Sequence, residues 1–195
     1  MVKLIGLDFD NTIVSYDKAF YLVALSKNLI PKSLKKKKVN VKEYLQGKDK
    51  ENEWIKLQGE VYGKYMHKAN FFPGFIKALN KLSKNYKFCI VSHRTKYPYK
   101  GKKINLHNAA KKWIKNKNLC NLVSIDKKNI FFLESKKEKI DKIKDLKCDI
   151  FIDDLENILI KLPKNLKKIH FTFKNDNKNI IMMKRWSEIH QILKN

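Results

Sequence analysis

Lys3-Leu4-Ile5-Gly6-Leu7-Asp8-Phe9-Asp10-Asn11-Thr12 is the stretch of sequence that decides the fold of this chain. Its apolar first half predicts a buried strand, which ends abruptly in two carboxylates, Asp8 and Asp10. Carboxylates are rarely buried without partners, because their desolvation is costly or shifts their pKa. At the carboxyl end of a parallel strand, the same pair would lie at the mouth of a crevice where α/β proteins bind ligands. The pair therefore predicts a site for a hard cation and a phosphate group.

The composition is that of one globular domain with a sizeable core and, at most, a modest insertion. The chain has 195 residues, of which 43% are hydrophobic. Its apolar runs are far shorter than the roughly 20 residues that span a bilayer, so we expect no membrane association. The first residues have no secretory pattern. The three cysteines are widely spaced and odd in number, which favours reduced thiols and a cytoplasmic location.

The formal net charge of +25 invites a nucleic-acid interpretation. Only Arg94 and Arg185 are arginines, however, and the lysines are scattered over nearly every expected helix and loop. Arginine is the preferred residue for two-pronged contacts to phosphates and guanines. The pattern therefore favours a solvated surface, and the alternative that the charge recruits an anionic substrate stays open.

Four further apolar runs predict strands, at residues 88–91, 130–133, 150–152 and 168–173. Helical periodicity occupies the segments between them, and a closing helix is expected within residues 180–193. Continuous apolar strands that alternate with helices are typical of a parallel sheet covered on both faces. We therefore expect an α/β fold with a five-stranded sheet.

The segment between the first two strands is too long for one crossover helix. Residues 15–70 are expected to form a small α-helical cap, inserted after the first strand and lying over the carboxyl edge of the sheet. Residues 1–14 and 71–195 would then form the core domain.

Polar groups recur where the expected strands end. Besides Asp8 and Asp10, these groups are Ser92, the lysines at the start of the helix at 136–146, and the pair Asp153-Asp154. The carboxyl ends of parallel strands open on one edge of a sheet, so these groups can converge. Carboxylates suit Mg²⁺, whereas a hydroxyl and an ammonium group suit phosphoryl oxygens.

This set of motifs resembles the haloacid dehalogenase-like (HAD) superfamily of phosphohydrolases. Leu-Asp-Phe-Asp-Asn-Thr at 7–12 is similar to its first motif, and Ser92 after Cys-Ile-Val to its second. A lysine near a helix start corresponds to the third motif, and Ile-Asp-Asp at 152–154 to the fourth. The resemblance covers residues 1–159 apart from the insertion. It implies a Rossmann-like sheet with helices on both faces, in which the first strand lies beside the fourth.

The resemblance also implies roles for the acids. Asp8 would attack phosphorus and form an aspartyl-phosphate, and Asp10 would first protonate the leaving oxygen and then activate water. Mg²⁺ would be bound by Asp8, by the backbone carbonyl of Asp10, and by the fourth-motif acids Asp153 and Asp154. An acid at residue 10 is absent from the dehalogenases of the superfamily, so Asp10 favours hydrolysis of a phosphate ester.

The remaining candidates would bind the phosphate or the leaving group. Thr12 would steady the turn after the strand, and Ser92 would donate a hydrogen bond to a phosphoryl oxygen. For the third-motif lysine, Lys139 is favoured over Lys136 because one turn into a helix still reaches the sheet edge. His93 and Arg94 are further substrate-binding candidates, for which an ordinary solvated loop is the alternative interpretation.

We therefore expect a Mg²⁺-dependent phosphatase of a small phosphorylated metabolite, such as a sugar phosphate or a nucleotide. One alternative is a nucleic-acid end phosphatase, whose binding would weaken steeply with salt. The other is a non-enzymatic binding module that keeps the fold. It would need none of the acids, so the four motifs argue against it.

Overall fold

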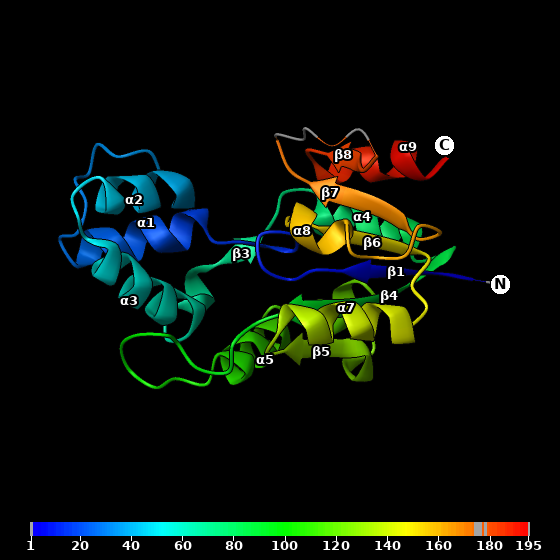
Figure 1. Cartoon of the computed structure of the whole chain (residues 1–195), viewed down its shortest axis with the longest axis horizontal. Helices are drawn as coiled ribbons and strands as arrows, with labels where there is room; N and C mark the ends of the chain where they lie inside the picture. The colour runs from blue at the N-terminus through cyan, green and yellow to red at the C-terminus, as the bar shows by residue number, and fades with distance from the viewer. Residues whose placement is uncertain (1, 174–176, 178, 195) are drawn as a thin grey trace. The chain divides into compact units, whose positions relative to one another are not determined.

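The computed structural model describes residues 2–173, 177 and 179–194, and the chain divides into two compact units (Figure 1). The first unit comprises Met1–Val14, Phe71–Arg94 and Asn118–Asn195. The second comprises Ser15–Asn70 and Thr95–Lys117. The expected ends of the core domain, Met1 and Asn195, lie outside the described residues.

The first unit is built on a sheet of six strands in which all neighbouring strands are parallel. In spatial order the strands are β5 (Ile130–Leu133), β4 (Tyr86–His93), β1 (Lys3–Leu7), β6 (Ile150–Asp153), β7 (Lys167–Phe171) and β8 (Ile181–Met183). The expected parallel α/β architecture is confirmed, with β1 between β4 and β6 (Figure 1).

The sheet has one strand more than expected, and the expected closing helix over residues 180–193 is wrong in its first half. Ile181–Met183 forms β8, which pairs with β7 and places Ile181 beside Ile169. Only Ile189–Lys194 is α-helical (α9), after a 3₁₀ turn at Trp186–Glu188. A short apolar run fits a buried strand and a buried helix equally well, so periodicity alone did not separate the two.

Helices cover the sheet and fix the position of its strands. They are α4 (Phe75–Leu82), α6 (Leu119–Leu122), α7 (Lys136–Asp145), α8 (Glu156–Leu159) and α9, with a further 3₁₀ turn at Lys127–Asn129. Ile143 of α7 and Ile158 of α8 share one buried cluster with Phe151 of β6. Beside this cluster, a Cβ atom on Gly6 would lie 2.4 Å from the Phe151 ring. A glycine at this position therefore lets Phe151 cover β1 closely.

The second unit is mainly helical. Its helices are α1 (Asp17–Ser26), α2 (Lys38–Gln46), α3 (Glu51–Tyr62) and α5 (Leu106–Asn116), with a 3₁₀ turn at Met66–Lys68. Two short strands, β2 (Val14–Ser15) and β3 (Asn70–Phe71), pair with each other, and each contains a point where the chain passes from one unit to the other. None of the described helices is long and apolar enough to cross a membrane.

Residues 95–117 belong to the second unit, whereas the sequence placed them in the core domain. The reason is the apolar face of α5. Its buried Trp113 donates a hydrogen bond of 3.1 Å from Nε1 to the carbonyl oxygen of Ala69. Lys117 likewise donates to the side chain of Asn70, at 3.1 Å. The amphipathic pattern of α5 predicts a buried face, but it does not identify the partner of that face.

Candidate active site

The candidate site lies where three neighbouring strands end. Asp8 directly follows β1, Ser92 is the second-last residue of β4, and Asp153 is the last residue of β6. The amide of Asp8 donates a hydrogen bond to the carbonyl of Ile152, at 2.9 Å, which extends the β1–β6 pairing by one residue. All three residues are buried, with exposed fractions of 4% or less. The parallel register therefore brings together three residues that are more than 60 positions apart in sequence.

A tight turn carries the chain from Asp8 back toward the sheet. Asn11 has a φ of 60°, a left-handed conformation that asparagine tolerates better than most residues. The amides of Ile13 and Val14 both donate to the carbonyl of Phe9, at 3.1 and 3.0 Å. Phe9 is fully buried and makes an edge-on contact with Phe132. The buried Phe9 anchors the turn, so Asp8 and Asp10 are held in fixed positions on either side of it.

Lys139 forms the electrostatic centre of the site. Its side chain is 1% exposed, and Nζ lies 2.5 Å from Asp8 Oδ1 and 2.6 Å from Asp153 Oδ2. A reciprocal capping box between Ser135 and Glu138 begins α7, which turns Lys139 inward one residue later. Lys136, the other candidate for the third motif, is exposed. Of the two lysines, Lys139 is therefore the one that contacts Asp8.

The pKa values of Asp8 and Lys139 are shifted by burial and by neighbouring charges. Burial raises the pKa of Asp8 well above its usual value, and the neighbouring acids Asp153, Asp154 and Asp10 raise it further, against the opposing effect of the Lys139 cation. Burial lowers the pKa of Lys139, but the carboxylates of Asp8 and Asp153 outweigh burial and leave that pKa raised. Lys139 is therefore a cation at neutral pH, and it offsets only part of the negative charge around it.

Asp10 is held by Arg94. The Nη1 atom of Arg94 donates to both carboxylate oxygens of Asp10, at 2.6 and 2.8 Å. The Arg94 side chain is 3% exposed and that of Asp10 is 19% exposed. The backbone amide of Arg94 donates to the carbonyl of Leu133, at 2.8 Å, which continues the pairing of β4 with β5. The same sheet edge that carries Ser92 therefore also fixes the orientation of the second acid.

Three carboxylates are close enough to share a cation. Ligand atoms of Asp8, Asp153 and Asp154 all lie within 4.8 Å of one another. Asp153 Oδ1 also accepts a hydrogen bond from the amide of Leu155, at 3.0 Å, and Asp154 Oδ2 accepts one from Asn11, at 3.2 Å. Asp10 is not part of this group. Only oxygen atoms are offered, which is the donor set that Mg²⁺ prefers.

Of the remaining candidates, Ser92 contacts Asp8, whereas Thr12 and His93 have other surroundings. Ser92 donates to Asp8 Oδ1, at 3.1 Å. Thr12 is fully buried, and its hydroxyl has no hydrogen-bond partner among the described residues, whereas its backbone carbonyl accepts from Trp186 at 3.0 Å. His93 is half-buried, with Nε2 3.2 Å from the carbonyl oxygen of Glu134, and burial lowers its pKa.

Two contacts at the site were not expected from the sequence. One is the Arg94–Asp10 pair, because Arg94 was expected to contact substrate. The other involves His170, whose Nε2 lies 3.0 Å from the carbonyl oxygen of Asp154. For Arg94 a signal existed, since it is one of only two arginines among 44 basic residues. No sequence pattern pointed to His170.

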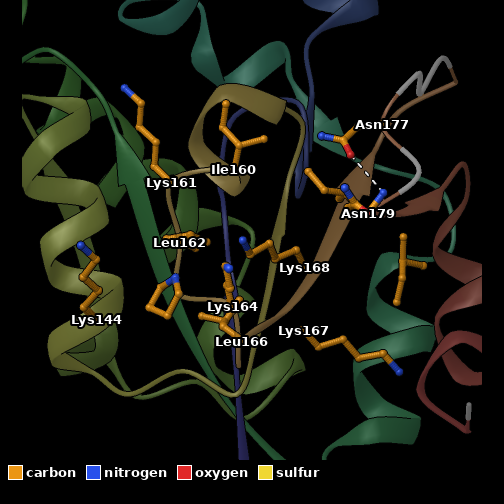
Figure 2. Close-up of a pocket in the computed structure, with 13 residues that line it drawn as sticks. Lys144, Ile160, Lys161, Leu162, Lys164, Leu166, Lys167, Lys168, Asn177 and Asn179 are labelled. Atoms are coloured by element: carbon orange, nitrogen blue, oxygen red, sulfur yellow. Dashed lines mark hydrogen bonds between the residues drawn. The ribbon is translucent and has the colours of Figure 1, made fainter.

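A groove lies elsewhere on the first unit (Figure 2). It has a volume of about 850 Å³ and is lined by residues that precede β7 and β8, among them Pro163 and Ile180. These residues lie at the amino ends of the strands, opposite the edge that carries Asp8. The groove is therefore separate from the candidate active site.

The comparisons with known proteins identify the fold. No family model matches the chain, and no curated protein does. Among solved structures, it is similar to a HAD-superfamily hydrolase from Ehrlichia chaffeensis, with a TM-score of 0.59, 15% identity and coverage of 99% of this chain and 96% of that one.

Two further solved structures similar to this chain are a magnesium-bound hydrolase and a dehalogenase. The HAD hydrolase YfnB from Bacillus subtilis, bound to magnesium, has a TM-score of 0.55 and 11% identity, with 99% of each chain covered. A 2-haloacid dehalogenase from Pseudomonas syringae has a TM-score of 0.52 and 11% identity, with coverage of 100% of this chain and 99% of that one. The chain has the haloacid dehalogenase-like fold, which at this identity specifies no substrate.

We predict that Lys139→Met lowers the free energy of unfolding by about 3–5 kcal/mol, because it leaves two buried carboxylates without their cation. The measurement is urea unfolding at neutral pH in the presence of a chelator. Lys137→Met is the matched control, because Lys137 lies on the same helix with an 88% exposed side chain paired to Asp141. Equal stability of the two variants would contradict the central role of Lys139.

Proposed function

We propose that this protein is a Mg²⁺-dependent phosphatase that hydrolyses phosphomonoesters through an aspartyl-phosphate on Asp8. The observation that carries the proposal is that two carboxylates close in sequence, Asp8 and Asp10, have different surroundings. Asp8 is buried against Lys139 and Ser92, whereas Asp10, two residues later, is partly exposed and held by Arg94. Different surroundings for two nearby acids are what an enzyme needs if one is to attack and the other is to transfer protons.

The proposed reaction has two steps. An oxygen of Asp8 attacks phosphorus, and the bond between phosphorus and the leaving oxygen breaks, with its electron pair going to that oxygen. Asp10 gives its proton to the leaving oxygen. Water then attacks the aspartyl-phosphate and gives a proton to Asp10, and the bond from phosphorus to Asp8 breaks, which releases phosphate and restores both acids. Ser92 and Lys139 lie beside Asp8, where they would hold phosphoryl oxygens.

Asp10 supports phosphate esters over haloacids as the substrate class. A dehalogenase is among the structures with this fold, so the fold alone does not choose. The dehalogenases that the sequence resembles have no acid at this position, because a halide leaves without a proton. An alkoxide leaving group does need one, and Asp10 would provide it. We propose a small phosphorylated metabolite as the substrate.

The donor set fits a magnesium ion. Asp8, Asp153 and Asp154 would hold it, together with the backbone carbonyl of Asp10, which the resemblance implies. The fit rests on the two buried acids, Asp8 and Asp153, for which Lys139 is the only cation that contacts them within the described residues. When bound, Mg²⁺ would neutralise the repulsion between a dianionic phosphate and these carboxylates.

We infer that Arg94 keeps Asp10 in one orientation. Its guanidinium group is buried and contacts both oxygens of the carboxylate, so rotation of the Asp10 side chain would break two charge-assisted hydrogen bonds. In this role Arg94 acts through Asp10 and need not touch the substrate.

We predict that Asp8→Asn lowers the turnover of p-nitrophenyl phosphate by about a thousandfold or more, because an amide is a poor nucleophile. Release of inorganic phosphate in the presence of Mg²⁺ measures the effect, and acid-quenched enzyme is assayed for a hydroxylamine-sensitive acyl phosphate. Asp145→Asn, at a 70% exposed side chain, is the control and should retain activity. Wild-type turnover by Asp8→Asn would refute the mechanism.

We predict that chelation of divalent metal abolishes turnover and that added Mg²⁺ restores it. Independently of activity, Mg²⁺ should raise the melting temperature of the wild-type protein, because an ion that binds only the folded state stabilises it. The shift should disappear in Asp153→Asn and in Asp154→Asn but persist in Asp145→Asn. A shift that survives in both site variants would place the ion elsewhere.

We predict that Arg94→Met lowers kcat by about ten- to a hundredfold with little change in KM, because a mobile Asp10 transfers protons inefficiently. The loss should be smaller for esters whose leaving group needs no proton. Arg185→Met is the matched control, since the Arg185 side chain is 76% exposed. A raised KM with unchanged kcat would instead show that Arg94 binds substrate.

A further inference from the structure

The groove drawn in Figure 2 is lined by lysines and aliphatic side chains. It is lined by Lys144, near the end of α7, by residues 160–164 and 166–168, and by residues 177 and 179–181, ahead of and within the start of β8. All strands of the sheet run in one direction, so these residues lie at its amino edge. Asp8 and Asp153 lie at its carboxyl edge. A ligand in this groove would therefore leave the candidate active site accessible.

The groove carries positive charge that the described residues do not neutralise. Five lysines line it, and none of its described lining residues is acidic. Lys167 donates to the carbonyl oxygen of Ile192, at 2.8 Å. The other four, Lys144, Lys161, Lys164 and Lys168, form no ion pair or side-chain hydrogen bond with any described residue. Lys168 is half-buried on β7, so its charge has lost part of its water without gaining a counter-ion from any described residue.

The floor of the groove is apolar. Leu162, Leu166 and Ile180 are 4–6% exposed and belong to the buried cluster beneath the groove. Ile160, which also lines the groove, is 53% exposed and adds aliphatic surface that a ligand could cover. A fitting ligand therefore combines anionic groups with aliphatic ones.

The lining residues fit an acidic peptide better than a single-stranded nucleic acid. Single-stranded nucleic acid is held by aromatic side chains that stack on bases and by arginine. The described lining residues include neither, so bases would find no stacking surface. Lysines are mobile point charges that match the carboxylates of a peptide, and an aliphatic floor matches leucine or isoleucine side chains.

We propose that this groove binds an acidic, aliphatic segment of a partner protein. Its carboxylates would pair with Lys161, Lys164 and Lys168, and its aliphatic side chains would cover Ile160 and Leu162. Figure 2 shows these side chains around the same hollow. The groove volume of about 850 Å³ accommodates a short stretch of extended chain. Binding there would place the protein on its partner while leaving the opposite sheet edge open.

The test uses fluorescence anisotropy with the full chain. The probe is a short fluorescein-labelled peptide in which glutamate and aspartate alternate with leucine. The triple variant Lys161→Gln, Lys164→Gln and Lys168→Gln should weaken binding by about tenfold or more. The control variant Lys42→Gln, Lys48→Gln and Lys111→Gln removes the same charge from exposed positions of the second unit and should change binding less than about twofold.

Two further comparisons make the outcome decisive. Replacement of leucine by serine in the probe should weaken its binding to the wild-type protein, because the aliphatic contacts are lost. Hydrolysis of p-nitrophenyl phosphate should be unchanged in both triple variants, so a failure here leaves the proposed activity untouched. Equal losses in the two triple variants, equal binding of the leucine and serine peptides, or tighter and groove-dependent binding of oligo(dT) would each overturn the proposal.

Discussion

The contact of Lys139 with Asp8 and Asp153 is the interaction on which the rest of the site depends. The two acids come from neighbouring strands and would repel each other if no cation lay between them. Lys139 reaches them from α7, so one side chain joins β1, β6 and the helix between β5 and β6. The sheet edge can bury two carboxylates because this ammonium group is buried with them. The site is therefore a product of how the helix docks on the sheet as much as of the strand ends.

The same interaction leaves the site short of positive charge. Four carboxylates surround two cations, Lys139 and Arg94, and each cation already contacts at least one acid. Burial, reinforced by the neighbouring carboxylates, raises the pKa of Asp8 despite the Lys139 cation, because a buried acid without enough positive charge nearby tends to keep its proton. A divalent cation bound by Asp8, Asp153 and Asp154 would correct the imbalance and let Asp8 act as an anion. The proposed metal ion would thus supply positive charge that the side chains of the site lack.

Most of the sheet and of the candidate site could be predicted, because short contiguous stretches of the sequence indicate them. An apolar run ending in acids identifies both a strand and its functional end, and parallel topology then brings such ends together. The choice of Lys139 over Lys136 follows from where α7 begins, which the capping box of Ser135 and Glu138 determines. Contacts between side chains distant in sequence had no such signal. Arg94 could reach substrate or Asp10, the face of α5 could cover either unit, and the run at 181–183 is too short to distinguish a strand from a helix.

The position of β1 has a consequence for how the protein is made. Both of its partner strands, β4 and β6, come much later in the chain, with Ile5 paired to Phe88 and Ile150. The nascent chain must therefore carry β1 without a partner until β4 (Tyr86–His93) has been synthesised, and with only one partner until β6 (Ile150–Asp153) follows. Such long-range parallel pairing is slow to form and leaves intermediates prone to aggregation. The central place that gives β1 its role in the site thus makes its pairing dependent on strands that follow it by about 80 and 145 residues.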